Sequence, residues 1–345
     1  MDLLPPRPVR RLVVAPIALV ISLLIVFASP LLLLLSAIAD FFSPGNWRTT
    51  RIVLFVITYA AFEVVGLVGL TILWFRALFG TRIKTEKMQS AHYAFMRWWL
   101  ATIDKVARKL FHIRIHIEDR PVPRPGPILV FSRHAGPGNS LLLIGTILVG
   151  YERRPRIVML AKLQWEPMFD IMLNRTPNRF IKHDPKRRSM YIETIADLAS
   201  GLGDRDAFVL FPEGKDFTPK VRQRAIDYLK SKGHDAAAVR AEKMEHVLPP
   251  RHGGVMAALR NARQADVVFV AHAVLEEVGT FKQLWSRIPL SQPIVARYWR
   301  IPPSEVPEGQ DELIEWLYGW WERIDKWIVD REAALAKSAA AGDAA

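Results

Sequence analysis

Two long apolar stretches lie near the start of the chain. Residues 12–42 carry a single charge, Asp40, and residues 52–78 carry Glu63 and, near their end, Arg76. A helix of about 20 apolar residues crosses the hydrocarbon core of a bilayer, and both stretches are longer than this. We therefore predict an N-terminal two-helix membrane hairpin rather than a helical hairpin buried in a soluble protein.

Basic residues gather on the outer flanks of these two stretches. The loop between the stretches carries only Arg48 and Arg51 as basic residues. Because cytoplasmic flanks of membrane helices are enriched in Lys and Arg, the pattern predicts that the N-terminus and everything after Leu78 lie in the cytoplasm. A secretory signal peptide is not favoured, because the apolar region is too long and lacks a small-residue cleavage site. The flanking residues are Arg7, Arg10, Arg11, Arg76, Arg82, Lys84 and Lys87.

From residue 88 onward the pattern changes to that of a soluble α/β domain. Residues 88–110 have the apolar spacing of a helix, and residues 112–118 alternate like a strand. This strand–helix alternation predicts an α/β fold with a mixed, mainly parallel sheet flanked by helices. Further short apolar runs, separated by helical patterns, are 128–131, 157–160, 180–181, 208–211 and 267–270.

Tryptophans recur at helical spacing near the C-terminus, in residues 311–328. Two interpretations fit this amphipathic helix equally well. Either it packs on the domain, or it lies at a membrane surface with its tryptophans at headgroup level. The alanine-rich tail after Arg331 is expected to be mobile.

Composition narrows the functional classes. The chain has no cysteine, which excludes disulfides, thiolate metal sites and cysteine nucleophiles. Lys and Arg total 47 against 34 Asp and Glu, a formal net charge of +13, which suits a nucleic acid or an anionic membrane. The apolar stretches favour the membrane, and no nucleic-acid-binding motif is evident. No compact metal-ligand signature occurs either.

The segment Phe131-Ser-Arg-His-Ala-Gly-Pro-Gly-Asn-Ser140 carries the first candidate chemistry. An apolar strand pattern precedes it and a helical pattern follows, so His134 is expected at a strand-to-helix turn, where functional residues often lie. A histidine followed five residues later by Asn139, whose side chain can hold an imidazole, suits a general base with its orienting partner. Taken alone, the pattern equally fits a turn in which the asparagine caps the next helix.

A second polar turn follows the apolar run 207–211 and reads Phe211-Pro-Glu-Gly-Lys-Asp216. Two weaker segments are Asn178–Asp184, in which a short strand pattern ends at Lys182, and Val247–Arg251, an apolar run that ends at proline. Each of these segments is non-specific by itself. A serine hydrolase is not favoured, because the Gly-x-Ser-x-Gly elbow is missing.

In their order along the chain, the four segments resemble the motifs of the glycerolipid acyltransferases, the family of 1-acylglycerol-3-phosphate and other lysophospholipid acyltransferases. The resemblance covers about residues 95–275, and Phe211-Pro-Glu-Gly214 matches its motif directly. Two departures stand out. Asn139 occupies the position of the family's aspartate, and Lys215 and Asp216 stand where the family continues with Thr-Arg.

The resemblance implies transfer of a fatty acyl group from acyl-CoA or acyl-carrier protein to the hydroxyl of a lysophospholipid-like acceptor, in phospholipid biosynthesis or remodelling. It implies no metal and no cofactor, a location at the cell membrane, and membrane lipids as partners. The expected organisation is residues 1–87 as membrane segments and flanks, 88–305 as the acyltransferase domain, and 306–345 as the C-terminal helix and tail. The expected catalytic residues are His134 and Asn139, and the expected substrate-binding residues are Arg133, Gly138, Lys182, Glu213, Gly214, Lys215 and Arg251.

The asparagine leaves three explanations open. An amide can present either its oxygen or its NH₂ group to the imidazole, and the equivalent replacement in a serine protease lowers turnover about 10⁴-fold. The chain is then a weak or inactive relative that binds lipid or acyl donor, or a variant that has lost its orienting carboxylate, or an enzyme in which Glu213 or Asp216 substitutes.

The other departure concerns the acceptor. An aspartate cannot replace arginine as a bidentate phosphate donor, although Lys215 can supply a point charge. Lysophosphatidic acid specificity is therefore not implied.

Related acyltransferases can also seat a two-helix element in one leaflet, so spanning and monotopic hairpins both stay open. The sequence makes no prediction of acceptor head group, acyl length or oligomeric state.

Overall fold

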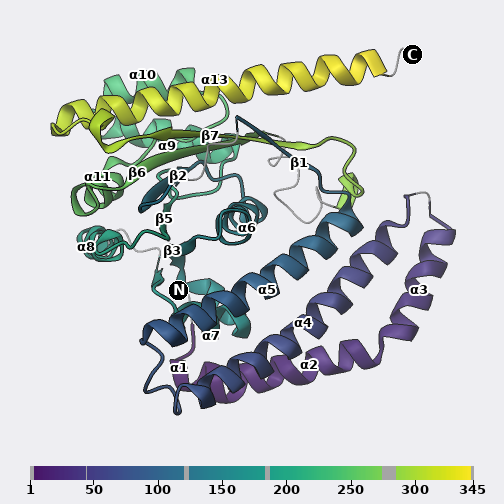
Figure 1. The fold of residues 1–345 in the computed structure, drawn as a ribbon. Coiled ribbons are helices and arrows are strands. Elements are labelled where there is room, and N and C mark those ends of the chain that lie inside the picture. Colours follow the sequence, from purple (N-terminus) through teal and green to yellow (C-terminus); the bar gives the residue numbers. More distant parts are fainter. Residues whose placement is uncertain (1–3, 44, 120–123, 183–186, 274–284, 343–345) are drawn as a thin grey trace. The chain divides into compact units, whose positions relative to one another are not determined.

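The computed structural model describes residues 4–43, 45–119, 124–182, 187–273 and 285–342. The chain divides into two compact units, and each draws on segments that are separated in the sequence (Figure 1). His183 and Asp184, the last two residues of the expected segment Asn178–Asp184, lie outside the described residues. Unit 1 comprises Met1–Ile113, Gly145–Arg188 and Ile288–Ser291, and unit 2 comprises Arg114–Ile144, Ser189–Arg287 and Gln292–Ala345.

Unit 1 begins with the apolar helices expected from the sequence. Two helical spans, Arg7–Phe27 and Arg48–Arg76, are long and apolar enough to cross a membrane. The first span is built from α1 (Arg7–Val9), the π-helical turn η1 (Arg10–Val14) and α2 (Ala15–Phe27), and the second is α4 (Arg48–Arg76).

The predicted first stretch, residues 12–42, is not one helix. It breaks at Ala28 into α2 and α3 (Ser29–Phe41), and the chain turns between them (Figure 1). Pro30 lies in the first turn of α3, where its missing N–H is tolerated, whereas it would interrupt a continuous helix. Their apolar side chains are largely exposed, Phe27 by 87%.

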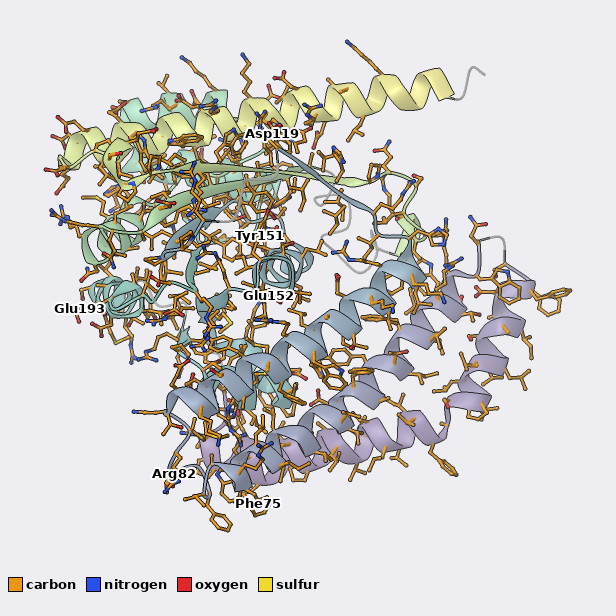
Figure 2. All side chains as sticks on the ribbon, in the orientation of Figure 1. Phe75, Arg82, Asp119, Tyr151, Glu152 and Glu193 are labelled. Carbon is orange, nitrogen blue, oxygen red and sulfur yellow. The ribbon has the colours of Figure 1, made fainter. Side chains whose placement is uncertain are left out.

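Helix α4 is the centre of the helical part of unit 1, where it packs against α2, α3 and α5 (Glu86–Phe111). Its approach to α7 (Pro167–Arg175) is close, because a Cβ on Gly66 would lie 2.6 Å from the sulfur of Met168. Phe75 and Arg82 mark the end of α4 and the turn after it (Figure 2). Unit 1 also holds η2 (Thr146–Gly150), η3 (Ala161–Trp165) and the parallel strands β3 (Arg154–Leu160) and β4 (Arg179–Ile181).

Unit 2 contains the sheet that carries the candidate site. Its strands lie in the order β1-β7-β6-β2-β5. The pair β6/β7 is antiparallel, and the pairs β1/β7, β2/β6 and β2/β5 are parallel. The expected α/β fold with a mixed, mainly parallel sheet is thereby confirmed. The strands are β1 (Ile115–Glu118), β2 (Ile128–Ser132), β5 (Asp206–Leu210), β6 (Asp266–Ala273) and β7 (Ile294–Ile301).

Helices accompany this sheet in unit 2. Helix α6 (Pro137–Gly145) follows β2 directly, and α9 (Pro219–Ser231) packs on α10 (Asp235–Lys243). The other described helices are α8 (Arg188–Ala199), α11 (His252–Asn261), the 3₁₀ turn η6 (Pro303–Glu305) and α13 (Gln310–Gly342).

Helix α13 packs on the sheet along β6 (Figure 1). Three of its tryptophans contact the ring of Phe269 on β6, and its apolar stripe is buried. Of the two interpretations of this helix, the packed one is therefore right. The helix continues to Gly342, so the expected mobile tail after Arg331 is helical over most of its length. The tryptophans on Phe269 are Trp316, Trp320 and Trp321.

Candidate active site

The first and second motifs meet because their strands are parallel neighbours. Phe131 of β2 pairs with Leu210 of β5, so both strands end at the same, carboxyl-terminal edge of the sheet. This edge is where open α/β sheets place their binding residues. Strand β6 also runs parallel to β2 and brings His272 to the same edge.

The His134 ring lies between the two turns. Its Nδ1 is 3.0 Å from Oδ1 of Asp216, although the atoms are not aligned for a hydrogen bond and Nδ1 is buried. The ring stacks on Phe211, with 4.5 Å between the centroids. The backbone around it is also fixed, because the His134 carbonyl accepts a hydrogen bond of 2.7 Å from the N–H of Phe217. The side chain keeps 23% of its surface exposed.

Asn139 does not hold the imidazole in this structure. Its side chain is buried, and Nδ2 donates to the carbonyl of Arg133 at 2.8 Å. No hydrogen bond joins it to the His134 ring among the residues described. The carboxylate closest to the ring is that of Asp216, which comes from the second motif rather than the first.

Arg133 is enclosed by the protein rather than presented to solvent. Its side chain is fully buried, and it donates to the carbonyls of His272 at 3.1 Å and His246 at 2.6 Å. The guanidinium also lies over the ring of Phe217, 5.7 Å from its centroid. A cation in this setting acts on its neighbours mainly through its field.

Glu213 is buried against the first motif. Its Oε2 accepts the backbone N–H of His134 at 3.2 Å, and its Oε1 accepts the indole N–H of Trp321 at 3.3 Å. Burial raises the pKa of Glu213 to about 8, while the field of Arg133 and these hydrogen bonds favour the charged form. The carboxyl group thus changes charge near neutral pH, with one oxygen on the amide of the candidate base.

Of the other expected binding residues, all but Lys182 lie in unit 2 together with His134. Gly214 has a φ of +69°, which favours glycine, and a Cβ there would come within 3.3 Å of the guanidinium of Arg251. Lys215 and Gly138 are exposed in unit 2. Lys182 follows β4 in unit 1, whereas His134 belongs to unit 2.

The titration of His134 suits a base. Burial lowers its pKa below the ordinary value and the nearby Arg133 lowers it further, while Asp216 raises it. The imidazole is therefore neutral at neutral pH and can accept a proton. His272 is fully enclosed, and burial lowers its pKa more strongly still.

Four residues at this site were not identified from the sequence. Trp321, His246 and His272 contact the motif residues Glu213 and Arg133, and Asp325 holds the backbone of His246. The periodicity of α13 indicates that Trp321 is buried, but nothing in the sequence indicates which polar group it meets. Within the described ranges, no group of three or more His, Asp or Glu could hold a metal ion.

Comparison with known proteins bears on this site. Residues 112–281 match the family model described as acyltransferase, which spans the turns of both His134 and Glu213. The chain is 20% identical over 293 residues to lysocardiolipin acyltransferase 1 of Mus musculus, with 81% of this chain and 73% of that protein covered. It is also similar to the crystal structure of the 1-acyl-sn-glycerophosphate (LPA) acyltransferase PlsC from Thermotoga maritima, at 13% identity and a TM-score of 0.43, over 77% of this chain and 97% of that one.

Proposed function

We propose that this chain, which matches the acyltransferase family model over residues 112–281, moves a fatty acyl group from acyl-CoA or acyl-carrier protein to the hydroxyl of a lysophospholipid-like acceptor. The observation that carries the proposal is the environment of His134. Its ring is partly exposed at the carboxyl edge of the sheet and has a carboxylate 3.0 Å from Nδ1. Its depressed pKa keeps it neutral.

The mechanism follows from the orientation of the ring. With Nδ1 facing Asp216, Nε2 is the nitrogen that takes the proton of the acceptor hydroxyl as the oxygen attacks the thioester carbonyl. The tetrahedral intermediate collapses, a C–O ester bond replaces the C–S bond, and the imidazolium gives its proton to the departing thiolate. The products are the acylated lipid and the free thiol of the donor, and no acyl-enzyme forms.

Asp216 supports activity despite the asparagine at position 139. A carboxylate beside Nδ1 stabilises the protonated ring and favours the tautomer with its free lone pair on Nε2. Of the three explanations for Asn139, the geometry favours substitution by another acid. An inactive relative that binds lipid or acyl donor is the alternative.

Basic side chains near the second motif suit an anionic acceptor. Lys215 and Arg251 are exposed, and the absence of a Cβ on Gly214 leaves room for the Arg251 guanidinium beside the turn. We assign these two cations to the acceptor headgroup. Gly138, at the start of α6, is assigned to anion binding through its backbone N–H. Lys182 is assigned to the same role as an exposed cation.

The membrane is the proposed location, with phospholipid biosynthesis or remodelling as the setting. Two observations within unit 1 support a hairpin seated in one leaflet. The start of the first span is bound to α7, because Arg10 and Arg11 pair with Asp170 at 2.9 and 2.8 Å. At the hairpin tip, Arg48 donates to the carbonyl of Ile288 at 2.8 Å. Both ends of the hairpin therefore contact the same folded unit, and its basic flanks assign that unit to the cytoplasmic side.

The test offers the full chain, in detergent or vesicles, labelled acyl-CoA and acyl-carrier protein with a panel of lysophospholipids. Mass spectrometry identifies the product. We expect transfer by the natural sequence and loss of at least about 100-fold in His134→Ala, the usual range for a lost general base. Binding without turnover, with turnover appearing in Asn139→Asp, would instead support the inactive alternative. No transfer by either protein across the panel would overturn the enzyme assignment.

A further inference from the structure

The C-terminal helix reaches the candidate site through one indole. Trp321 of α13 is fully buried, and its Nε1 donates to Oε1 of Glu213 at 3.3 Å. The other oxygen of the same carboxylate accepts the backbone N–H of His134 at 3.2 Å. One carboxyl group therefore joins α13 to the peptide that carries the candidate base.

A second set of hydrogen bonds begins at Asp325, one helical turn after Trp321. Asp325 is buried, and its two oxygens accept the backbone N–H groups of Glu245 at 3.0 Å and His246 at 2.6 Å. The carbonyl of His246 in turn accepts a hydrogen bond of 2.6 Å from Arg133. Arg133 precedes His134, so this second set ends on the adjoining residue.

We propose that α13 is a positioning element for the catalytic turn, with Trp321 acting on His134 through Glu213 and Asp325 acting on Arg133 through the peptide of His246. The inference rests on the proposed function, because the residue that is positioned is the base of that reaction. Neither Trp321 nor Asp325 is assigned a contact with substrate.

The contacts separate this role from simple packing. Trp316 and Trp320 already attach α13 to the sheet through the ring of Phe269. The apolar contact does not need an indole N–H aimed at a carboxylate. A buried indole N–H and a buried carboxylate satisfy each other, and an unmatched change leaves one of them without a partner.

Because Glu213 titrates, the positioning role of Trp321 can be measured as a change in the pH profile of the enzyme. The groups that face its carboxyl are Arg133, the N–H of His134, the Trp321 indole and the backbone N–H of Leu248. Each of them favours the carboxylate over the acid. Removing the indole donor therefore raises the pKa of Glu213 further, and the charge beside His134 appears only at higher pH.

The chain supplies a matched control on the same helix. Trp327 is also buried, and its Nε1 donates to Oε2 of Glu118 at 3.0 Å. Glu118 ends β1 and is no part of the catalytic turn. Trp321→Phe and Trp327→Phe thus remove the same indole and the same kind of hydrogen bond from one helix, and only the first touches Glu213.

The experiment compares the full chain with these two variants and with Asp325→Asn. We expect Trp321→Phe to lower kcat by about 5- to 50-fold with KM within about threefold, since a positioning loss falls on the transition state. We expect its pH profile to shift upward by a few tenths of a unit or more, as an order of magnitude for one lost hydrogen bond. Trp327→Phe keeps its kcat within about twofold and its pH profile unchanged. Asp325→Asn lowers kcat in the same direction as Trp321→Phe.

Two further measurements test the positioning role of Trp321. In a Glu213→Gln background the effect of Trp321→Phe should shrink, because the intermediary is already altered. The titration of the His134 ring, followed by NMR in histidine-labelled protein and assigned with His134→Gln, needs no turnover. An inactive natural sequence would end the proposed function but leave this titration decisive. Equal kcat and equal His134 titration in Trp321→Phe and Trp327→Phe would overturn the inference.

Discussion

At the scale of single residues, the side chain nearest the His134 ring comes from the second motif and not from the first. The motif position occupied by Asn139 faces the carbonyl of Arg133, while Asp216 of the other turn lies beside the imidazole. A carboxylate that reaches His134 from the turn after β5 can stabilise the protonated ring as well as one from the helix that follows His134. In the proposed mechanism, Asp216 therefore supplies the charged partner of His134 that the family motif places at position 139.

Asp216→Asn tests this role of Asp216. Loss of the carboxylate beside Nδ1 removes the stabilisation of the protonated ring, so we expect kcat to fall by about 10²- to 10⁴-fold, the range known for general-base and triad changes. Steady-state acyl-transfer kinetics provide the measurement. Asp227→Asn, on the exposed side of α9 where it accepts from Gln223, is the matched control and should keep natural activity. A fully active Asp216→Asn would remove Asp216 from the mechanism.

Asn139→Asp should not improve this protein. The amide nitrogen donates to the carbonyl of Arg133 in a buried position, and a carboxylate there would set oxygen against oxygen. Loss of a buried hydrogen bond costs about 1–3 kcal/mol, so thermal or denaturant unfolding should show a less stable protein with no gain in turnover. Higher turnover in this variant would instead return the orienting role to position 139.

His272 makes stability depend on pH in a definite direction. Both ring nitrogens lack a hydrogen-bond partner in the described part of the chain, and burial holds its folded pKa well below the ordinary 6.5. The unfolded chain then binds the extra proton first, so stability is lost as pH falls below about 6.5. In melting curves, His272→Leu should be stabilised relative to the natural protein more at pH 5.5 than at pH 7.5. His234→Leu, on an exposed turn, is the control. An equal effect at both pH values would mean that His272 is not held neutral.

The structure confirms that His134 and Glu213 each lie in a short turn after an apolar strand, while the proposed role of Glu213 comes from the family resemblance. Asp216 could only be proposed as one of two substitutes, because its distance from the ring depends on how the second turn folds back. Trp321 and Asp325 could not be predicted at all. Periodicity places a side chain on the buried face of a helix, but the identity of its polar partner is a property of tertiary packing.

At the scale of elements, apolar patterning located the long helices α4, α5 and α13 and the central strands β2, β5 and β6. The strand β7 was missed, because Ile294–Ile301 mixes arginines and aromatic residues with its aliphatic ones and does not alternate cleanly. The first apolar stretch breaks at Ala28, ahead of Pro30, a residue that commonly kinks a helix or begins one. Apolar length alone does not reveal where a long helix turns.

The contact of α4 with α7 gives a prediction at this scale. Gly66→Leu inserts a side chain where even a Cβ would lie 2.6 Å from the sulfur of Met168. Overpacking costs about 1–3 kcal/mol, so the melting temperature should fall, and Met168→Ala in the same chain should recover part of the loss by making room. Gly145→Ala, which meets nothing within 4 Å, is the control. An unchanged melting temperature in Gly66→Leu would show that the helices are not packed this closely.

At the scale of the whole molecule, the chain is organised by interleaving rather than by consecutive blocks. Residues 145–188 join the N-terminal helices in unit 1, while the sheet of unit 2 is assembled from segments on both sides of them. The expected blocks 1–87, 88–305 and 306–345 follow the change of composition along the chain, and they stay a prediction of the domain organisation. Lys182 lies between the first and second motifs in the sequence, yet it belongs to unit 1, whereas both of those motifs belong to unit 2.

The central claim is that the imidazole of His134 removes a proton from a lipid hydroxyl during acyl transfer. The most direct measurement is product formation from labelled acyl donor and lysophospholipid by the natural protein, by His134→Ala and by the control His234→Ala, followed by mass spectrometry. We predict acylated lipid from the natural and control proteins and at least about 100-fold less from His134→Ala. Equal product from all three proteins would contradict the account.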